Sequence, residues 1–370
     1  MYANVDSLAN KVQELKFRVN DTYSKPHIIA LTEIKHKNKW NIDISELQIE
    51  GYTIYSNNLQ DNGRGIVNYV RRDIICQQIY LDNSFNEYLL LQLQLKNKSK
   101  VLIGTIYRSP NSLSDNDSKL FGFIDNFSLF SNKYKLLLGD FNCPNINWDL
   151  WSSSNAFELK FLDKLRKNML FQFVNTPTRS RGKDTPHILD LIISDGNFIE
   201  NIEHEAPLGK SDHSVLLIEC VLKDEMAKRS LIEKYALSKG DYNSLRDCLT
   251  CIDWEDMLNP HKSNIDDMWN VFKTTIENNI DLHIPKVRNF SSFKKEQWTR
   301  PLDPQLRAKI AKKHRLWTRY METRNVTVLK KYKSVRNAVK RDVQKIIKLE
   351  QHEIASQCKN NPKKIWSYLY

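Results

Sequence analysis

Short apolar runs that end in polar residues recur along the first part of the chain. The clearest run, Lys135–Leu138, indicates a buried strand, and Gly139, Asp140, Phe141 and Asn142 follow it. Asp140 and Asn142 are two positions apart, so in an extended chain both side chains leave the same face. A carboxylate can take a proton from water, and a neighbouring carboxamide can donate to a phosphoryl oxygen. A turn in which both residues cap backbone groups is the competing interpretation.

The pattern over residues 1–222 predicts a sheet-rich region with a few helices. Strands are expected at residues 28–33, 65–70, 89–95, 101–107, 188–194 and 215–222. The longer helical period predicts helices at residues 8–19, 120–130 and 157–170. Strands that alternate with occasional helices predict an α/β sandwich, in which two layered sheets have helices outside.

The pattern changes after residue 222. From Pro304, apolar residues recur at spacings of three and four, and the opposite faces are rich in Lys and Arg. This pattern predicts long amphipathic helices, which pack on another surface more often than they fold alone. We therefore expect two parts, residues 1–222 and a mostly helical, basic segment at residues 223–370.

Charge separates the same two parts. The net charge is +12, but residues 1–222 hold 25 basic against 26 acidic residues, and residues 223–370 hold 31 against 18. Within the second part, residues 286–364 hold 23 against 6. A polyanion is therefore the expected partner of the C-terminal part. The longest apolar runs are far shorter than a membrane span, and we expect no membrane partner.

Cysteine usage and the N-terminus predict an intracellular protein. The six cysteines show no metal-ligand spacing, and we expect reduced thiols. The N-terminus carries Asp6 and Glu14 without an apolar block, so we expect no secretory signal.

Polar side chains recur where the predicted strands end. They are Asn4, Asp6, Glu33, Tyr107, Asp140, Asn142, Asp190, Asp212 and His213. A carboxylate at the end of a buried strand is costly unless it is paired or bound to a cation, so several such residues predict one shared site. Oxygen ligands without Cys or paired His spacing favour Mg²⁺, with Mn²⁺ as the alternative.

Six sequence blocks occur in a recognisable order. They are Asn4–Leu8, Leu31–Glu33, Ile106–Pro110, Gly139–Asn142, Thr176–Arg179 followed by Ile188–Ile192, and Ser211–Ser214. Together they resemble the endonuclease/exonuclease/phosphatase superfamily, and within it the apurinic-type endonuclease domain of LINE-type non-LTR retrotransposons. The resemblance spans residues 2–222 and implies a DNase I-like, four-layer α/β/β/α sandwich. Residues 223–370 resemble the basic connector that precedes a reverse transcriptase in these elements.

The resemblance also implies the metal and phosphate contacts. Glu33 would be the principal Mg²⁺ ligand, with Asp6 beside it and Asp212 near the metal. Tyr107 would contact the scissile phosphate, and Asn4 would hydrogen-bond the site from the first strand. The competing interpretations are a turn carboxylate for Asp6, a strand-end cap for Asn4 and a core tyrosine with a satisfied hydroxyl for Tyr107.

The catalytic roles follow from the same resemblance. Asp140 would activate or orient the attacking water, and Asn142 would stabilise the oxyanion of the transition state. His213, oriented by Asp190, would hydrogen-bond the phosphate. The reaction implied is in-line hydrolysis of a phosphodiester that leaves 3′-hydroxyl and 5′-phosphate ends.

Basic residues in both parts are candidates for nucleic-acid binding. Arg108 and Arg179 would contact backbone phosphates, although a solvated arginine is the default for each. The candidates in the connector are Lys312, Lys313, Arg315, Arg336, Lys340 and Arg341. They would bind through salt-sensitive phosphate contacts, unless this face packs on a polymerase instead.

The function expected is that of a Mg²⁺-dependent DNA endonuclease whose nick primes reverse transcription in the nucleus. Its partners would be target DNA, element RNA and a reverse transcriptase domain in cis, which this sequence lacks. The alternatives are a catalytically silent nucleic-acid-binding remnant and a phosphatase or abasic endonuclease of the same superfamily. Only Met1–Ala3 precede the first block, and a strand that short would place Asn4 and Asp6 poorly. With no polymerase palm before Tyr370, we expect a truncated reading frame, a fragment or a decayed copy.

Overall fold

The computed structural model describes most of the chain. The described residues are 1–21, 25–36, 42–57, 63–81, 85–182, 184–228, 232–262, 264–289 and 303–358. They form two compact units, Met1–Lys228 with Trp298–Tyr370 (unit 1) and Arg229–Gln297 (unit 2). The last part of the predicted connector, residues 359–370, lies outside the described residues.

The first sheet of unit 1 holds the N-terminal strand in its interior. Its strands lie in the order β11-β12-β1-β2-β4-β3. They are β1 (Tyr2–Asn4), β2 (Ile28–Thr32), β3 (Tyr52–Asn57), β4 (Ile66–Arg71), β11 (Ile199–Glu205) and β12 (Val215–Cys220). Strand β1 pairs in parallel with β2 and antiparallel with β12. Three residues are enough for β1, because strands on both sides satisfy its backbone groups.

The second sheet carries the strand that ends in the central acidic motif. Its order is β5-β6-β7-β8-β10-β9. The strands are β5 (Cys76–Ile79), β6 (Tyr88–Gln94), β7 (Lys100–Tyr107), β8 (Tyr134–Asp140), β9 (Phe171–Gln172) and β10 (Asp190–Ser194). Strands β7 and β8 are parallel, and β10 lies antiparallel to β8. The parallel connection runs through α2 (Ser114–Leu129), as a parallel pair requires a long crossover.

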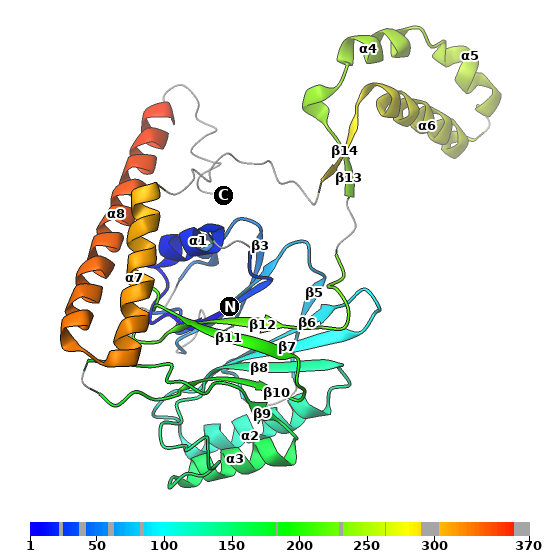
Figure 1. Ribbon diagram of the computed structural model, residues 1–370. Coiled ribbons are helices and arrows are strands. Elements are labelled where there is room, and N and C mark those ends of the chain that lie inside the picture. Colours follow the sequence, from blue (N-terminus) through cyan, green and yellow to red (C-terminus); the bar gives the residue numbers. More distant parts are fainter. Residues whose placement is uncertain are drawn as a thin grey trace. The chain divides into compact units, whose positions relative to one another are not determined.

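Helices cover the outer face of each sheet. Helix α1 (Val12–Asp21) packs on the first sheet, and α2 packs with α3 (Ala156–Lys167) on the second. A third apolar cluster joins residues of both sheets. The predicted four-layer α/β/β/α fold is confirmed (Figure 1).

Strand β8 shows why its sequence is apolar without alternation. Leu136 and Leu138 belong to the cluster between the sheets, whereas Leu137 belongs to the cluster under α2 and α3. Both faces of the strand are therefore buried, as in other central strands covered on both sides. By contrast, the sequence pattern did not predict β11. It is an edge strand, and its residues Glu200, Asn201 and Glu203 are not buried, so it lacks an apolar run.

Helices α7 (Pro304–Thr323) and α8 (Val326–Cys358) form a hairpin within unit 1. Arg324 ends α7 in the left-handed conformation, with φ of 51°. The Asn325 side chain then accepts a hydrogen bond from the Thr327 amide at 2.8 Å, which caps the start of α8. One long helical pattern in the sequence thus becomes two helices that pack on each other.

The hairpin is attached to α1 and to the end of β11. Trp317, Tyr320 and Tyr332 form a buried cluster with Ala206. The buried Lys313 ammonium pairs with Glu14 of α1 at 2.5 Å. Breaking such a pair would leave an uncompensated buried charge, so the hairpin is an integral part of unit 1.

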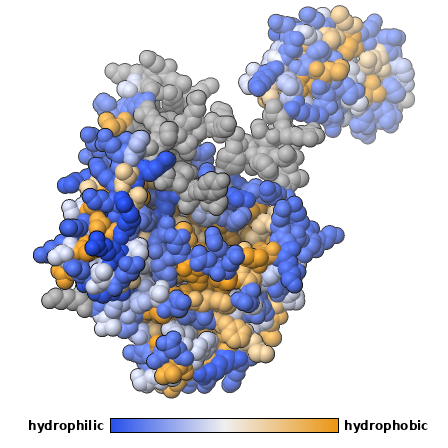
Figure 2. Space-filling model, viewed as in Figure 1, coloured by the Kyte–Doolittle hydropathy of each residue, from blue (hydrophilic) through white to orange (hydrophobic). Residues whose placement is uncertain are grey.

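Unit 2 is a small helical unit with a two-stranded sheet. Its elements are β13 (Ile232–Tyr235), β14 (Lys286–Asn289), α4 (Tyr242–Thr250), α5 (Trp254–Leu258) and α6 (Ile265–His283). The ring centroids of Trp254 and Phe272 are 5.2 Å apart, and those of Trp269 and Phe272 are 5.8 Å apart. Apolar residues remain at the surface of this unit (Figure 2).

Short 3₁₀ turns at Ile44–Leu47, Leu237–Lys239 and Asn259–His261 complete the described elements. None of the described helices is both long enough and apolar enough to pass through a lipid bilayer.

Acid is expected to destabilise the attachment of α7 through His314. Its Nδ1 accepts a hydrogen bond from the Ala206 amide at 3.4 Å. Burial, with Arg18 and Lys313 nearby, lowers the pKa of His314 from 6.5 to about 2. Below its ordinary pKa, this histidine binds a proton in the unfolded chain but not in the folded chain. The free energy of unfolding therefore decreases as the pH is lowered. The expected loss is at most about 1.4 kcal/mol per pH unit, measured as urea midpoints between about pH 7 and pH 5.

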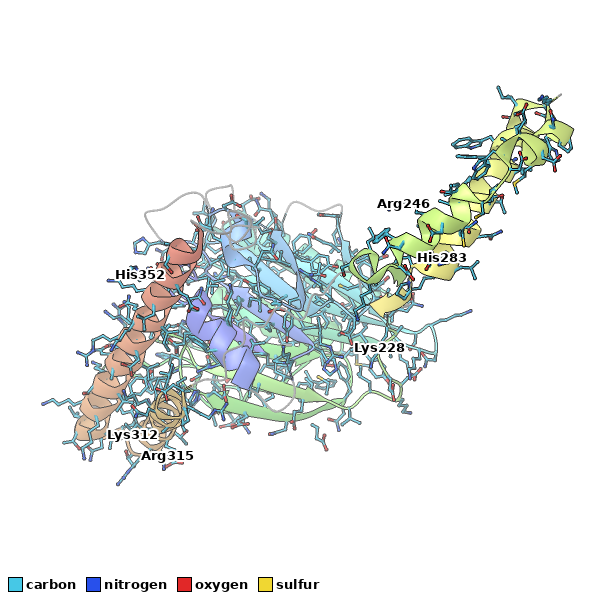
Figure 3. All side chains as sticks on the ribbon, turned by 90° about the horizontal axis from the view of Figure 1, so that it is seen from above. Lys228, Arg246, His283, Lys312, Arg315 and His352 are labelled. Atoms are coloured by element: carbon cyan, nitrogen blue, oxygen red, sulfur yellow. The ribbon has the colours of Figure 1, made fainter. Side chains whose placement is uncertain are left out.

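His314→Asn keeps an acceptor near the position of Nδ1 and should make the urea midpoint less dependent on pH. The matched control is His352→Asn, because His352 is an exposed histidine of α8 (Figure 3). If wild type and His314→Asn lose the same stability on acidification, His314 is not the sensitive group.

Candidate active site

Two buried carboxylates face each other at the ends of β8 and β10. Asp140 and Asp190 are direct partners in the antiparallel register, and Tyr107 lies opposite Asp140 on β7. Asp140 is 1% exposed and Asp190 is 0% exposed. Gly139 permits this arrangement, because a Cβ at its position would lie 2.0 Å from the carbonyl oxygen of Ile106. The sheet itself therefore brings the two acids together.

Side chains from the first sheet complete the cluster. Asn4 Nδ2 donates to Asp140 Oδ2 at 2.8 Å, and the Tyr2 hydroxyl donates to Asp190 Oδ1 at 2.9 Å. His213 Nδ1 donates to the second Asp190 oxygen at 2.7 Å. The short first strand thus places Asn4 on Asp140, contrary to the expectation of poor placement. Ligand atoms of Asp140, Asp190 and His213 all lie within 4.8 Å of one another.

The electrostatics of the cluster suit proton transfer. Burial and then the Asp190 carboxylate raise the pKa of Asp140 from 3.8 to about 7. Burial alone would lower the pKa of His213, but the Asp190 carboxylate outweighs it and raises the pKa from 6.5 to about 10. Asp140 is therefore poised to exchange a proton near neutral pH, while His213 is held as a cation.

The backbone is strained where strands of the site end. Asp6, Glu33 and Asn142 have φ values of 40°, 55° and 48°, in the left-handed region that residues other than glycine rarely adopt. Such conformations cost about 1–3 kcal/mol each and tend to concentrate at functional sites.

Glu33 and Asp6, which follow strands of the first sheet and are expected to bind the metal, both pair with Arg64. Arg64 Nη2 pairs with Glu33 Oε2 at 2.5 Å and with Asp6 Oδ1 at 2.8 Å. Burial, and then the Glu33 and Asp140 carboxylates, raise the pKa of the Tyr107 hydroxyl. Tyr107 is not among the cavity-lining residues in the described part of the chain. Tyr107 is buried, at 5% exposure, and packs with Ile66 and Leu89.

A cavity of about 500 Å³ opens beside the acidic cluster. Its lining includes Asn4, Asp6, Glu33, Asp140, Asn142, Arg179, Lys210, Asp212 and His213. Asp212, expected near the metal, accepts from Arg179 Nε at 3.0 Å and lies 3.9 Å from His213 Nε2. The donors are mostly carboxylate oxygens with one imidazole, a set that fits a hard divalent ion such as Mg²⁺.

The structure places Arg108 away from this cavity. Arg108 is 6% exposed, and its Nε and Nη2 donate to the Asp117 carboxylate at 2.7 and 3.0 Å. Its guanidinium also stacks on the Phe157 ring at 3.8 Å. The Arg108 carbonyl accepts from Asn142 Nδ2 at 2.7 Å. Arg108 therefore fixes the turn that carries Asn142 and has no surface for backbone phosphates.

The basic residues predicted in the connector fall into three settings. Lys312 and Arg315 are exposed on α7 (Figure 3), and Arg341 is exposed on α8. Lys313 is buried against Glu14, so it cannot meet a nucleic acid in this arrangement. Lys340 is half-buried, and Arg336 is half-buried and lines the cavity.

Several residues that support the site carry no individual signal in the sequence. Tyr2 and Arg64 hold carboxylates, and Ser211 Oγ donates to the Asn4 carbonyl at 2.7 Å. Thr178 Oγ1 accepts the amides of Leu189 and Asp190. Thr178 and Ser211 lie inside recognised sequence blocks, which was the available signal. Arg64 could be identified only from the fold.

Residues 101–217 match a family model described as "Endonuclease-reverse transcriptase". The matched segment runs from β7 into β12 and contains Asp140, Asp190 and His213. It confirms the resemblance to a DNase I-like endonuclease domain and indicates a hydrolase of the nuclease type. Among curated proteins, none matches the chain significantly.

Solved structures with a similar chain path share little sequence identity with this chain. The endonuclease domain of TRAS1, a telomere-specific non-LTR retrotransposon, is 14% identical, with a TM-score of 0.47 over 60% of this chain and 97% of its own. The 3′ phosphatase NExo from Neisseria, bound to a product DNA hairpin, is 16% identical, with a TM-score of 0.44 over 60% and 98%. An endonuclease/exonuclease/phosphatase from Beutenbergia cavernae is 13% identical, with a TM-score of 0.43 over 64% and 73%.

Asp190→Asn should lower the pKa of His213 from about 10 toward its ordinary value of 6.5. The substitution removes the carboxylate at 2.7 Å but keeps the burial that disfavours the cation. The measurement is an NMR titration of the His213 ring protons. Asp212→Asn serves as the matched control and should lower this pKa less, since Asp212 lies at 3.9 Å. An unchanged pKa in folded Asp190→Asn would refute this assignment.

Proposed function

We propose that this chain is a metal-dependent DNA endonuclease of retrotransposon origin, which hydrolyses a phosphodiester to 3′-hydroxyl and 5′-phosphate ends. The observation that carries the proposal is the convergence of Asn4, Asp140, Asp190 and His213 in one buried cluster beside a cavity. These residues come from both sheets, and no structural role requires two buried acids side by side. In the element this nick would prime reverse transcription on nuclear DNA.

Each side chain has a task in the proposed reaction. Asp140 takes the proton of the attacking water, since its pKa lies near neutrality and Asn4 holds its second oxygen. His213, kept cationic by Asp190, donates from Nε2 to the phosphate and offsets the charge that develops on it. One amide hydrogen of Asn142 holds the Arg108 carbonyl, and the other is assigned to a phosphate oxygen.

The carboxylates of Glu33 and Asp6 would hold the metal ion. Both already share one cation, the Arg64 guanidinium, so the two groups can neutralise a positive charge between them. When bound, a divalent ion supplies charge neutralisation at the phosphate oxygens. We assign Asp212 to hold Arg179 at the cavity rim, where Arg179 can meet a neighbouring phosphate.

The same Arg64 pairs favour a second candidate function, a nucleic-acid-binding remnant without catalysis. In that case Arg64 would permanently replace the metal, and the basic hairpin would keep its affinity for a polyanion. The two candidates differ in one measurable property, which is cleavage of bound DNA.

Supercoiled plasmid incubated with the protein and Mg²⁺ should be converted to nicked circles, and EDTA should prevent this. Asp140→Asn should reduce the rate by about 10²–10⁴-fold, the usual contribution of a general base. The matched control is Asp163→Asn, because Asp163 is an exposed acid on α3 outside the cavity. It should nick at the wild-type rate.

A folded wild-type protein that binds plasmid with no nicking would overturn the endonuclease proposal and support the remnant. Equal nicking by wild type and Asp140→Asn would show that the acidic cluster is not the catalytic site. Hydrolysis of a phosphomonoester without nicking would indicate a phosphatase.

A further inference from the structure

One wall of the catalytic cavity comes from the α7–α8 hairpin. The hairpin residues that line the cavity are Trp317, Leu329, Tyr332, Lys333 and Arg336. The same cavity is lined by Asp140 and His213. The helices predicted as a separate connector therefore take part in the site that would cleave the substrate.

This wall is held rigidly against the catalytic sheets. Lys313 is 1% exposed and pairs with Glu14 of α1, and Arg18 Nη2 of α1 lies 3.3 Å from His314 Nε2 of α7. Trp317 is 3% exposed and packs against Tyr332, with ring centroids 5.1 Å apart. An aromatic core and a buried ion pair together make the hairpin a fixed wall of the cavity.

The hairpin also holds a loop that lines the same cavity. The Tyr320 hydroxyl donates to the Gly182 carbonyl at 3.1 Å, and Arg324 Nη1 donates to Ser180 Oγ at 2.7 Å. Ser180 and Gly182 line the cavity and directly follow Arg179 in the chain. Hydrogen bonds therefore join the hairpin to the loop that contains Ser180 and Gly182.

Lys333 and Arg336 bring positive charge into this cavity. They lie three positions apart on α8, so they share one face of the helix. Within the described residues neither forms an ion pair with a carboxylate, and the Nε of Arg336 is buried with no hydrogen-bond partner. Arg336 also lies over the Tyr332 ring, 5.9 Å from its centroid. The visible face of the hairpin is mostly hydrophilic (Figure 2).

An ammonium and a guanidinium without acidic partners suit a phosphate group. The acids of the cleavage cluster repel a negatively charged phosphate unless positive charge lies nearby. The cationic side chains of this wall would supply that charge and attract the substrate strand into the cavity.

We propose that Lys333 and Arg336 form a phosphate-binding subsite for the phosphate next to the one that is cleaved. The proposal rests on the endonuclease function argued above. It specifies the substrate class: a polynucleotide strand with at least two phosphates, in preference to an isolated diester. The connector helix is then part of the nuclease, which ties substrate binding to an intact α7–α8 hairpin.

The test compares Lys333→Ala/Arg336→Ala with the matched variant Lys330→Ala/Lys331→Ala, which removes two exposed charges of α8 outside the cavity. Binding of a single-stranded oligonucleotide of about 12 residues is measured by fluorescence anisotropy in EDTA, at several salt concentrations. The cavity variant should bind on the order of tenfold more weakly. The slope of the logarithm of its binding constant against the logarithm of the salt concentration should become shallower by about one for each side chain removed. The control variant should differ little from wild type.

A second measurement uses Mg²⁺ and compares hydrolysis of the oligonucleotide with that of a dinucleotide, which has one phosphodiester. The preference for the longer substrate should fall about tenfold in the cavity variant and stay unchanged in the control. Equal effects of the two double substitutions would overturn the subsite. If wild type hydrolyses neither substrate, the endonuclease function fails, whereas the binding measurement still decides the subsite.

Discussion

The arrangement of unit 1 depends on two carboxylates that the fold places side by side away from water. Asp140 and Asp190 are register partners on adjacent strands, so no movement of a side chain can separate them by much. Two buried like charges are tolerated only if donors surround them. Asn4, Tyr2 and His213 supply these donors. Asn4 and Tyr2 belong to β1 of the other sheet, and His213 belongs to the loop before β12. The two sheets are therefore joined by this polar cluster as well as by their apolar core.

The same constraint explains the cationic surroundings of the site. Arg64 pairs with two acids and Arg179 pairs with a third. Lys333 and Arg336 also line the cavity, and neither forms an ion pair with a carboxylate of the described residues. A site with this many acids needs compensating positive charge, whether from arginine, from a metal ion or from both. In the proposed function, the substrate phosphates add negative charge that a metal ion and the basic wall would balance.

Individual residues show how far sequence reasoning reached. The order of motifs predicted the fold, and it identified Asp140, Asp190 and His213, which the structure brings together. Arg108 and Lys313 were assigned to nucleic acid, but each is buried in an ion pair with a partner that the sequence could not specify. Arg64 had no assigned role, since its partners lie 31 and 58 positions away and depend on how β2, β4 and β1 pair. The connector was expected to serve another domain, whereas α7 packs on β11 and α8 on α1.

The sequence by itself determined the local features, because these depend on neighbours along the chain: apolar runs that become strands, the longer period of the helices, and the order of polar motifs at strand ends. Which cation meets which carboxylate, and which surface closes the cavity, was decided only by the tertiary structure. Those contacts join residues up to about 300 positions apart, such as Glu14 and Lys313. Their energies depend on burial, and burial is a property of the packed sheets and helices and not of any segment alone.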